Sequence, residues 1–187
     1  MFQKQLLKTT ALSALFYFLC VCFAVVIDLG IFRVTNMAHT PSLSALFAGG
    51  VYLRMVKKTK TFGPITALGL MMSIFFFFSG HFVWAFLPNI LCALIADVIA
   101  KTGRYVNNQM NVLSYVMFSL GNLAPIVTMW IAPKAYAAQL LAEGKTQAYV
   151  DRVMIPATVT EIGSHILGIV VCAVVSGMVY LFIQKRK

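Results

Sequence analysis

Charged residues are scarce in this 187-residue chain, making up 11% of it, and only five of them are acidic. A soluble globular domain carries about 25% charged residues, so this composition cannot build a surface that faces water. Soluble nucleases, kinases and dehydrogenases are therefore excluded. Hydrophobic residues make up 60% of the chain, and the mean hydropathy is +0.87. The composition indicates a small polytopic membrane protein.

Cysteine is also rare, and its four residues all lie within apolar segments, at Cys20, Cys22, Cys92 and Cys172. Buried cysteines of this kind usually behave as small hydrophobic residues, so we expect no disulfide framework. Cys20 and Cys22 would face two sides of a helix, which makes them a poor metal pair. We expect no cleaved signal peptide, because the first apolar run is longer than a signal core and no cleavage site precedes a soluble domain.

A spanning helix needs about 20 apolar residues, so the chain has room for about six spans and no soluble ATPase or catalytic domain. We therefore predict an all-α, polytopic bundle in one membrane domain over residues 1–187. Polar stretches separate the apolar runs at residues 33–41 and 134–156. The predicted spans cover about residues 9–32, 42–56, 62–86, 87–100, 110–132 and 157–183.

The net charge of +10 comes from short basic clusters beside apolar runs, which is typical of cytoplasmic anchoring rather than of nucleic-acid binding. An even number of spans puts both termini on one side. That side would hold eleven basic residues: Lys4, Lys8, Arg54, Lys57, Lys58, Lys60, Lys101, Arg104, Lys185, Arg186 and Lys187. The other side would hold Arg33, Lys134, Lys145 and Arg152. The positive-inside rule thus predicts cytoplasmic termini and outer segments at 33–41 and 134–156.

The few polar residues of the spans lie mainly toward their outer ends. They are Asp28 in the first span, His81 and Trp84 in the third, Asn122 and Thr128 in the fifth, and Glu161 and His165 in the sixth. The first outer segment adds Asn36 and His39, whereas Asp97 belongs to the inner side. This distribution predicts one pocket that opens to the outside or is capped there.

Glu161 and His165 are four residues apart and so share one helix face. An ionisable residue within a span is by default a functional hypothesis, and the alternative is a hydrogen bond that joins helices. Metalloprotease chemistry is not indicated, because an HExxH motif is absent. Asp28 would either bind a cationic substrate group or pair with Arg33.

Several other features have a structural interpretation beside a functional one. His81 is either a metal or haem ligand or a hydrogen-bonded core residue, and Trp84 is either an interface anchor or a stacking platform. Phe75 to Phe78 are expected to pack on lipid and neighbouring helices, and Asn107, Asn108 and Asn111 to cap a helix. Gly144-Lys145-Thr146 is not a phosphate loop, because Gln139 stands where the required glycine would be.

Thr10 and Ala14 form a small-xxx-small pair in the first span. Such pairs allow helices to approach closely, either to a membrane partner or within the chain.

Over its whole length the sequence resembles the substrate-binding S components of energy-coupling factor (ECF) importers, and especially their MptD-type (Trep_Strep) branch. The resemblance lies in the chain length, the short second span with LFAGGVYLRMVKKTKTFGPI, the segment LPNILCALIADVIAKTGRY, and YVMFSLGNLAPI in the fifth span. It implies a six-helix protein that binds a nutrient from outside, beneath the first outer loop.

The resemblance further implies a transmembrane T component and two ATPases as partners, with the S component toppling in the membrane. Family members contact the T component through an AxxxA-like face of the first helix. Here Leu15 follows Ala11 at that spacing, so the contact would shift to Thr10 and Ala14, beside Ala11. ATP hydrolysis would reside in the partners, and this chain would not be an enzyme.

The sequence therefore predicts a prokaryotic cell-membrane S component that binds a small nutrient in an outer pocket. The predicted binding residues are Asp28, Asn36, His39, His81, Trp84, Glu161 and His165, with the segment RVTNMAHT as the gate. The leading substrate hypothesis is haem or another planar metal-containing cofactor, with axial ligation by His81 or His165 and propionates at Arg33 or Arg152. A flat vitamin without metal is the alternative substrate, and no resident cofactor or protein metal site is expected.

A secondary transporter and a membrane enzyme are the two alternatives to an S component. A proton-coupled secondary transporter would use Glu161 or Asp28 as its carrier, but such proteins usually place their sites near the midplane. An integral membrane enzyme would need a paired acid and base or a metal cluster, for which three histidines and five acids are sparse.

Overall fold

The computed structural model describes residues 2–33, 36–78 and 83–186, and within these ranges every regular element is helical. The all-α prediction is thus confirmed for the described residues. The α-helices are α1 (Phe2–Gly30), α2 (Thr40–Phe47), α3 (Gly49–Thr59), α4 (Pro64–Phe78), α5 (Phe86–Thr102), α6 (Asn108–Leu120), α7 (Ala124–Ile131), α8 (Pro133–Ala142), α9 (Gln147–Val153) and α10 (Val159–Lys185). Two 3-10 turns, η1 (Val83–Ala85) and η2 (Gly121–Leu123), precede α5 and α7.

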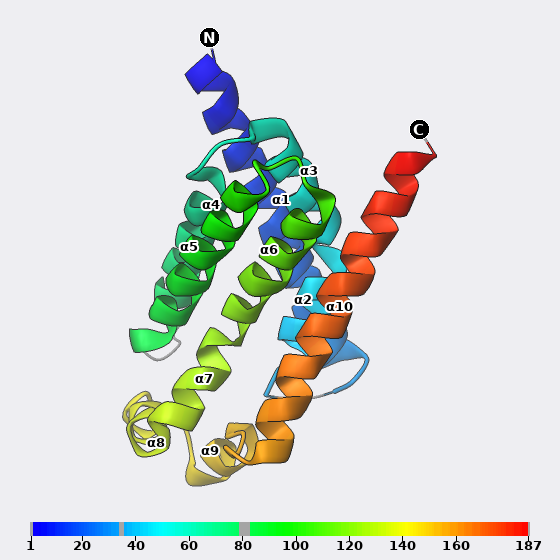
Figure 1. Cartoon of the computed structure of the whole chain (residues 1–187). Helices are drawn as coiled ribbons and strands as arrows, with labels where there is room; N and C mark the ends of the chain where they lie inside the picture. Colours follow the sequence, from blue (N-terminus) through cyan, green and yellow to red (C-terminus); the bar gives the residue numbers. More distant parts are fainter. Residues whose placement is uncertain (1, 34–35, 79–82, 187) are drawn as a thin grey trace.

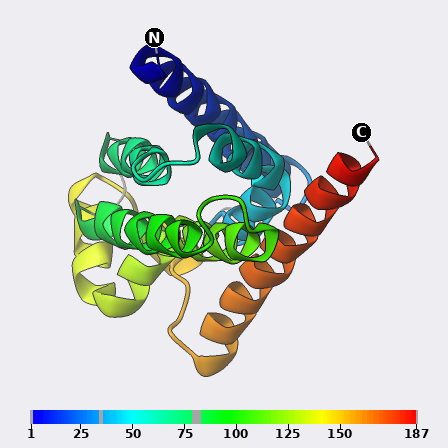
Figure 2. The same ribbon diagram turned by 45° about the horizontal axis from the view of Figure 1, so that its top comes forward.

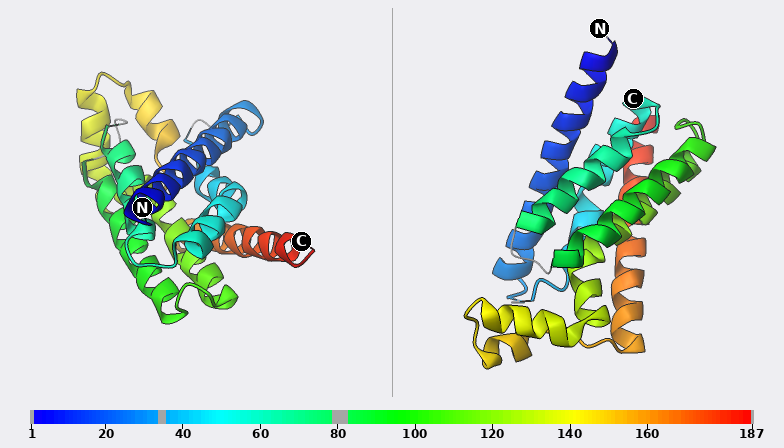
Figure 3. Two further views of the ribbon diagram at one scale, coloured as in Figure 1. Left: turned by 90° about the horizontal axis from the view of Figure 1, so that it is seen from above. Right: turned by 90° about the vertical axis from the view of Figure 1, so that its left-hand side faces the viewer.

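The long helices form a bundle with both chain termini at one end (Figure 1). We call this the terminal end; it also holds the α3–α4 and α5–α6 connections, as the tilted view shows (Figure 2). The opposite end carries α8 and α9, residues 133–153, which we call the cap. Helix α8 runs across the end of the bundle rather than along it (Figure 3). One end of the bundle is therefore covered by a separate layer.

Three helical stretches are long and apolar enough to cross a membrane: Gln3–Gly30, Asn108–Ile131 and Val159–Lys185. The shorter Pro64–Phe78 is also apolar. Only 28% and 22% of the most apolar windows of the first and last stretch are buried, against 61% for the middle one. The middle stretch is therefore central, while α1 and α10 present apolar faces outward, as expected of helices in lipid. A count of six spans stays a prediction.

The helix boundaries differ from the predicted spans at three points. The second predicted span consists of α2 and α3, which are separate helices on either side of Ala48. The helix of the third predicted span ends at Phe78 instead of residue 86. Helix α5 begins at Phe86, so Pro88 lies within its first turn, where a missing backbone N–H disrupts no helical hydrogen bond.

The fifth predicted span is bent by local sequence. Pro125 lacks a backbone N–H, and the chain passes through the 3-10 turn η2 between α6 and α7 just before it. At the start of α6 the Asn107 side chain accepts hydrogen bonds from the N–H groups of Gln109 and Met110, at 2.9 and 3.2 Å. The capping prediction for Asn107 is therefore confirmed. Asn111 has another role and donates to the Tyr105 carbonyl at 3.1 Å.

A buried carboxylate organises the terminal end. Asp97 of α5 has no exposed surface, and its Oδ2 accepts from the N–H of Gly63 at 2.8 Å and from the Thr66 hydroxyl at 2.9 Å. The Tyr105 hydroxyl donates to Oδ1 at 3.1 Å. Asp97 thus satisfies the otherwise unpaired N–H groups at the start of α4 and holds the α5–α6 turn against it.

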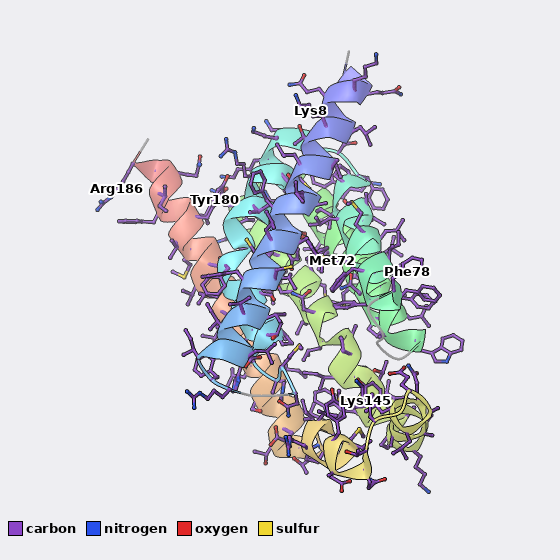
Figure 4. All side chains as sticks on the ribbon, turned by 180° about the vertical axis from the view of Figure 1, so that it is seen from behind. Lys8, Met72, Phe78, Lys145, Tyr180 and Arg186 are labelled. Atoms are coloured by element: carbon purple, nitrogen blue, oxygen red, sulfur yellow. The ribbon has the colours of Figure 1, made fainter. Side chains whose placement is uncertain are left out.

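Helices α3 and α10 also meet near the terminal end. The Lys57 ammonium group lies 5.4 Å from the ring centroid of Tyr180, a residue labelled in Figure 4. Figure 4 also labels Lys8 and Arg186 at this end, far from Lys145 in the cap. The basic residues beside the spans therefore collect where the termini lie.

The small-residue pair of α1 faces the protein interior. Thr10 and Ala14 are buried, and α1 packs against α2, α3 and α4. The Thr10 hydroxyl donates to the Leu6 carbonyl of its own helix at 3.0 Å. Ala11, by contrast, is exposed. The sequence allowed this pair to contact either a membrane partner or another helix of the same chain, and the structure shows it packed within the chain.

Candidate functional site

A cavity of about 580 Å³ lies between the bundle and the cap. This volume is in the range of ligand pockets for small molecules and cofactors. Its walls come from the later part of α1, the 36–41 segment with α2, the end of α4, the η2–α7 segment, and the cap. The cavity therefore lies at the end of the bundle where the sequence predicts a pocket.

Most of the cavity wall is apolar. Val21 and Val25 come from α1, and Ile126 and Met129 come from α7. The apolar body of a ligand would displace water from this surface, which stabilises the complex by about 25 cal/mol per Å². The wall predicts a ligand with a substantial apolar part.

The four consecutive phenylalanines of α4 divide between two environments. Phe75 and Phe76 line the cavity, and the Phe75 ring also packs edge-on against Phe18 of α1. Phe77 and Phe78 are exposed, and Figure 4 shows Phe78 pointing away from the bundle. Phe75 thus packs on a neighbouring helix as predicted, and the prediction did not include that Phe75 and Phe76 also line the cavity, because successive helical residues point in different directions.

Three polar side chains line the cavity within the bundle: Thr40, Ser44 and Asn122. The Thr40 hydroxyl donates to Asp28 at 2.9 Å, and the Ser44 hydroxyl donates to the Thr40 carbonyl at 2.7 Å. Asn122 is 7% exposed, and its Nδ2 donates to the Tyr17 hydroxyl at 3.1 Å. Its Oδ1 is buried without a hydrogen-bond partner among the described residues.

The cap contributes the charged part of the lining. Glu143 and Lys145 flank Gly144, whose φ of +82° is the left-handed conformation that glycine adopts without strain. The Glu143 carboxylate accepts from Gln139 at 2.8 Å. The Lys145 ammonium group lies 5.4 Å from the Tyr149 ring centroid. The cap therefore places one acid and one base over an apolar cavity.

Tyr136 of α8 is the most buried polar side chain that the cap contributes to the lining. Burial raises the pKa of Tyr136 to about 12, and the neighbouring Tyr149 and Glu143 act in the same direction. Its phenol is therefore neutral throughout the physiological pH range.

The first outer segment reaches the cavity through Asn36 and Met37. The Asn36 side chain accepts from the Ala38 N–H at 3.3 Å, which forms a local turn. Asp28 anchors this segment: its Oδ2 accepts from the His39 N–H at 2.9 Å, and its Oδ1 lies 3.1 Å from the His39 ring. Asp28 has no exposed surface and is fully engaged by the segment rather than paired with Arg33.

Glu161 and His165 lie on the face of α10 that meets α7. The His165 ring lies edge-on to Trp130, with centroids 5.8 Å apart, and its Nδ1 is 3.8 Å from the Glu161 carboxylate and 2.8 Å from the Glu161 carbonyl. Neither side chain is among the residues that line the cavity in the described part of the chain. The polar contacts of this pair therefore stay within α10, and only the ring contact of His165 with Trp130 reaches another helix.

The other predicted binding residues do not converge on the cavity. Among the described residues, its lining excludes His39, Trp84, Arg33 and Arg152, and each of these four is exposed. His81 lies outside the described residues. Of the predicted binding residues that the structure describes, only Asn36 therefore lines the cavity. The rest of the described lining consists of residues outside the predicted set.

Several lining residues were not among the predicted binding residues, including Asn122, which the sequence placed among the polar residues near the pocket; they differ in how visible they are in the sequence. Asn122 is an amide within an apolar span, next to Gly121 and just before Pro125, and that isolation is a usable signal. Glu143, Lys145 and Tyr149 lie in a polar segment whose helices and direction have no clear sequence pattern.

The described lining offers little to a metal ion. No group of three or more histidine, cysteine, aspartate and glutamate residues with ligand geometry exists among the described residues. The lining there contains the thioethers of Met37 and Met129 but no imidazole.

Residues 4–186 match the family model described as hypothetical bacterial integral membrane protein (Trep_Strep). The chain belongs to the Trep_Strep family. It is therefore a bacterial integral membrane protein, in agreement with its apolar helices. Comparisons with curated proteins and with solved structures gave no match.

Proposed function

We propose that this Trep_Strep protein is the substrate-binding S component of an ECF-type importer. The observation that supports this most is the cavity of about 580 Å³ at the end of the bundle opposite the termini. It is bordered by the first outer segment and the cap, and most of its described lining is apolar. Such a site is suited to holding a small molecule without changing it covalently.

The proposed orientation follows from charge. The basic clusters of the described chain gather at the terminal end, which the positive-inside rule assigns to the cytoplasm. The cavity and its cap would then face outward in the cell membrane. A nutrient would enter from outside, and its release would require partners that act from within the membrane and the cytoplasm.

Those partners would be a transmembrane T component and two ATPase subunits. The test is affinity purification of the tagged protein from native bacterial membranes in mild detergent, followed by mass spectrometry. We expect one further membrane protein and two ATPases in stable proportion. Recovery of the chain alone, together with uptake activity of the chain alone in liposomes, would contradict the proposal.

The same liposomes test the alternative of a proton-coupled transporter that uses Asp28 or Glu161. Asp28 accepts hydrogen bonds from the His39 N–H and the Thr40 hydroxyl of its own chain, and Glu161 contacts His165 away from the cavity. Neither carboxylate is therefore placed to exchange protons with a ligand in the cavity. We expect that a proton gradient drives no uptake by the isolated protein.

For the substrate, we propose a metal-free nutrient with an apolar body, such as a flat vitamin. Haem is tested directly by an absorption spectrum of the purified protein before and after addition of haemin. A Soret band that shifts on binding and weakens in His81→Ala or His165→Ala would establish a porphyrin site instead. We expect no shift, with the protein remaining folded.

A further inference from the structure

The charge in the described lining of the cavity lies in one place. Glu143 and Lys145 both belong to the short connection between α8 and α9, in the cap. The described lining that comes from the bundle and from the first outer segment contains no ionisable side chain. A ligand would therefore meet an apolar wall along most of its length and one acid and one base at the cap.

Both charged groups are near tyrosines that also line the cavity. The Lys145 ammonium group is 5.4 Å from the ring centroid of Tyr149. Burial is the main cause of the raised pKa of Tyr136, and the neighbouring Tyr149 and the charge of Glu143 add to it, which places the Glu143 carboxylate close to this buried phenol. The acid and the base therefore accompany the aromatic part of the cap, and Figure 4 labels Lys145 there.

The two charges are not neutralised by other described residues. Neither side chain forms an ion pair with the other or with another residue of the described chain. Glu143 accepts a hydrogen bond from the neutral amide of Gln139 at 2.8 Å, and Lys145 contacts a neutral ring. Both residues are exposed, so a ligand has room to reach them.

A ligand end with a single charge fits this pair poorly. Two peptide units separate the Cα atoms of Glu143 and Lys145, which are therefore at most about 7 Å apart. A carboxylate attracted by Lys145 would be repelled by Glu143, and an ammonium group would meet the reverse. An uncharged end that covered the pair would remove water from two ions and replace none of its hydrogen bonds.

A ligand end with one ammonium group and one carboxylate satisfies both residues, because each of its charges forms a charge-assisted hydrogen bond with the opposite charge of the cap. We propose that the cavity binds a zwitterion with an apolar body, the class of the apolar α-amino acids. The ammonium group of the ligand lies at Glu143, its carboxylate lies at Lys145, and its apolar body extends toward the walls formed by α1 and α7. This inference rests on the proposed function of the cavity as a nutrient site, and it names the class of the metal-free substrate.

The test is isothermal titration calorimetry of the full-length protein in detergent with L-tryptophan, L-phenylalanine and L-leucine. For the amino acid that binds best, two analogues complete the set: the corresponding amine, which has no carboxylate, and the corresponding desamino acid, which has no ammonium group. The variants are Glu143→Gln and Lys145→Gln. Their matched controls are Asp151→Asn and Lys134→Gln, because these exposed cap residues lie outside the described lining.

We expect the wild-type protein to bind the amino acid more tightly than either analogue. Glu143→Gln should weaken binding of the amino acid about tenfold, the value of one charge-assisted hydrogen bond, but should not weaken binding of the desamino acid. Lys145→Gln should weaken the amino acid by a similar factor but should not weaken the amine. The two control variants should bind all ligands as the wild-type protein does.

This pattern separates direct contact from structural damage, since a distorted cavity would weaken all three ligands alike. Three results would overturn the inference: no binding of any of the amino acids, equal binding of the amino acid and both analogues by the wild-type protein, or equal binding of the amino acid by the wild-type protein and both lining variants. Size-exclusion profiles show whether the variants are folded, and the wild-type comparison decides even if they are not.

A second assay distinguishes these failures from failure of the proposed function. Full-length protein immobilised in detergent is incubated with the small-molecule fraction of yeast extract, washed and eluted with methanol, and retained compounds are identified by mass spectrometry. Retention only of compounds that are not zwitterions with an apolar body would overturn the inference and leave the nutrient-binding function intact. If the wild-type protein retains nothing and binds no amino acid, the nutrient-binding function itself fails.

Discussion

Asp28 and His39 join the first helix to the segment that follows it through two contacts. The His39 N–H donates to Asp28 Oδ2 at 2.9 Å, and the His39 ring lies 3.1 Å from Oδ1. The Thr40 hydroxyl adds a third contact, just where α2 begins. A fully buried carboxylate thus holds the chain beside the cavity, which gives Asp28 a positioning role rather than a direct one.

Replacing this carboxylate should loosen the segment. In Asp28→Asn a neutral amide replaces the charged acceptor, so the hydrogen bonds from the His39 N–H and the Thr40 hydroxyl become weaker. We expect a loss of about 1–3 kcal/mol in stability and faster proteolysis within residues 31–39. Thermal unfolding in detergent and limited proteolysis measure the two effects.

Asp151→Asn is the matched control, because Asp151 is exposed and its carboxylate accepts from Gln147 at 2.7 Å, one turn away on the same helix. A similar loss in both variants would show that removal of a negative charge, and not the position of Asp28, is responsible.

Asp97 allows stability and binding to be separated. Asp97→Asn should weaken the junction of α4 with α5 by about 1–3 kcal/mol, because the carboxylate accepts from Gly63, Thr66 and Tyr105. The cavity lies at the other end of the bundle, so retention of compounds from yeast extract should not change. Loss of retention in a variant that is still folded would contradict this separation.

The close approach of α4 and α5 depends on Gly69. A Cβ atom built there would collide with the Cβ of Ala93. We therefore expect Gly69→Ala to lower the melting temperature despite the higher helix propensity of alanine. Gly163→Ala in α10 is the control, since nothing lies within 4 Å of its Cβ position, and it should stabilise the helix by up to about 1 kcal/mol. Equal effects of the two substitutions would argue against this contact.

Tyr136 should make the protein sensitive to alkaline pH. Burial raises the pKa of Tyr136 to about 12, above the value of about 10 for an unfolded chain, so the folded state holds the proton more tightly. The resulting stability is complete below about pH 10 and is lost as the pH rises toward 12. Between pH 10 and pH 12 the wild-type protein should lose about 2 kcal/mol more of its free energy of unfolding than Tyr136→Phe does, as measured by thermal unfolding. Parallel pH curves for the two proteins would contradict the prediction.

The sequence predicted the helical class, the apolar runs and the end of the bundle that holds the cavity, because these depend on composition and charge. It also predicted that Asn107 caps a helix, since capping is a local interaction. It did not predict that Phe75 and Phe76 turn toward the cavity while Phe78 turns away, because a uniformly apolar run has no amphipathic signal. The direction in which each of these phenylalanine side chains points depends on packing against helices that are distant in the sequence.

The site was harder to predict for a related reason. Rare ionisable residues stood out in the sequence, yet Asp28 holds its own backbone and His165 joins α10 to Trp130. The groups that line the cavity are less conspicuous: an amide at Asn122, and charges in a segment that folds as two short helices. Rarity identifies buried polar groups, but it does not distinguish those that serve the fold from those that serve a ligand.

The cap forms a layer of its own, and α8 packs chiefly on α7 and α9. Most of the buried core lies in the bundle, so substitutions in residues 133–153 can alter the roof of the cavity while the long helices keep their packing. Under the proposed function, changes confined to this segment would alter ligand preference without disturbing the packing of the long helices. Exchange of the 133–153 segment between relatives would transfer part of that preference as a unit.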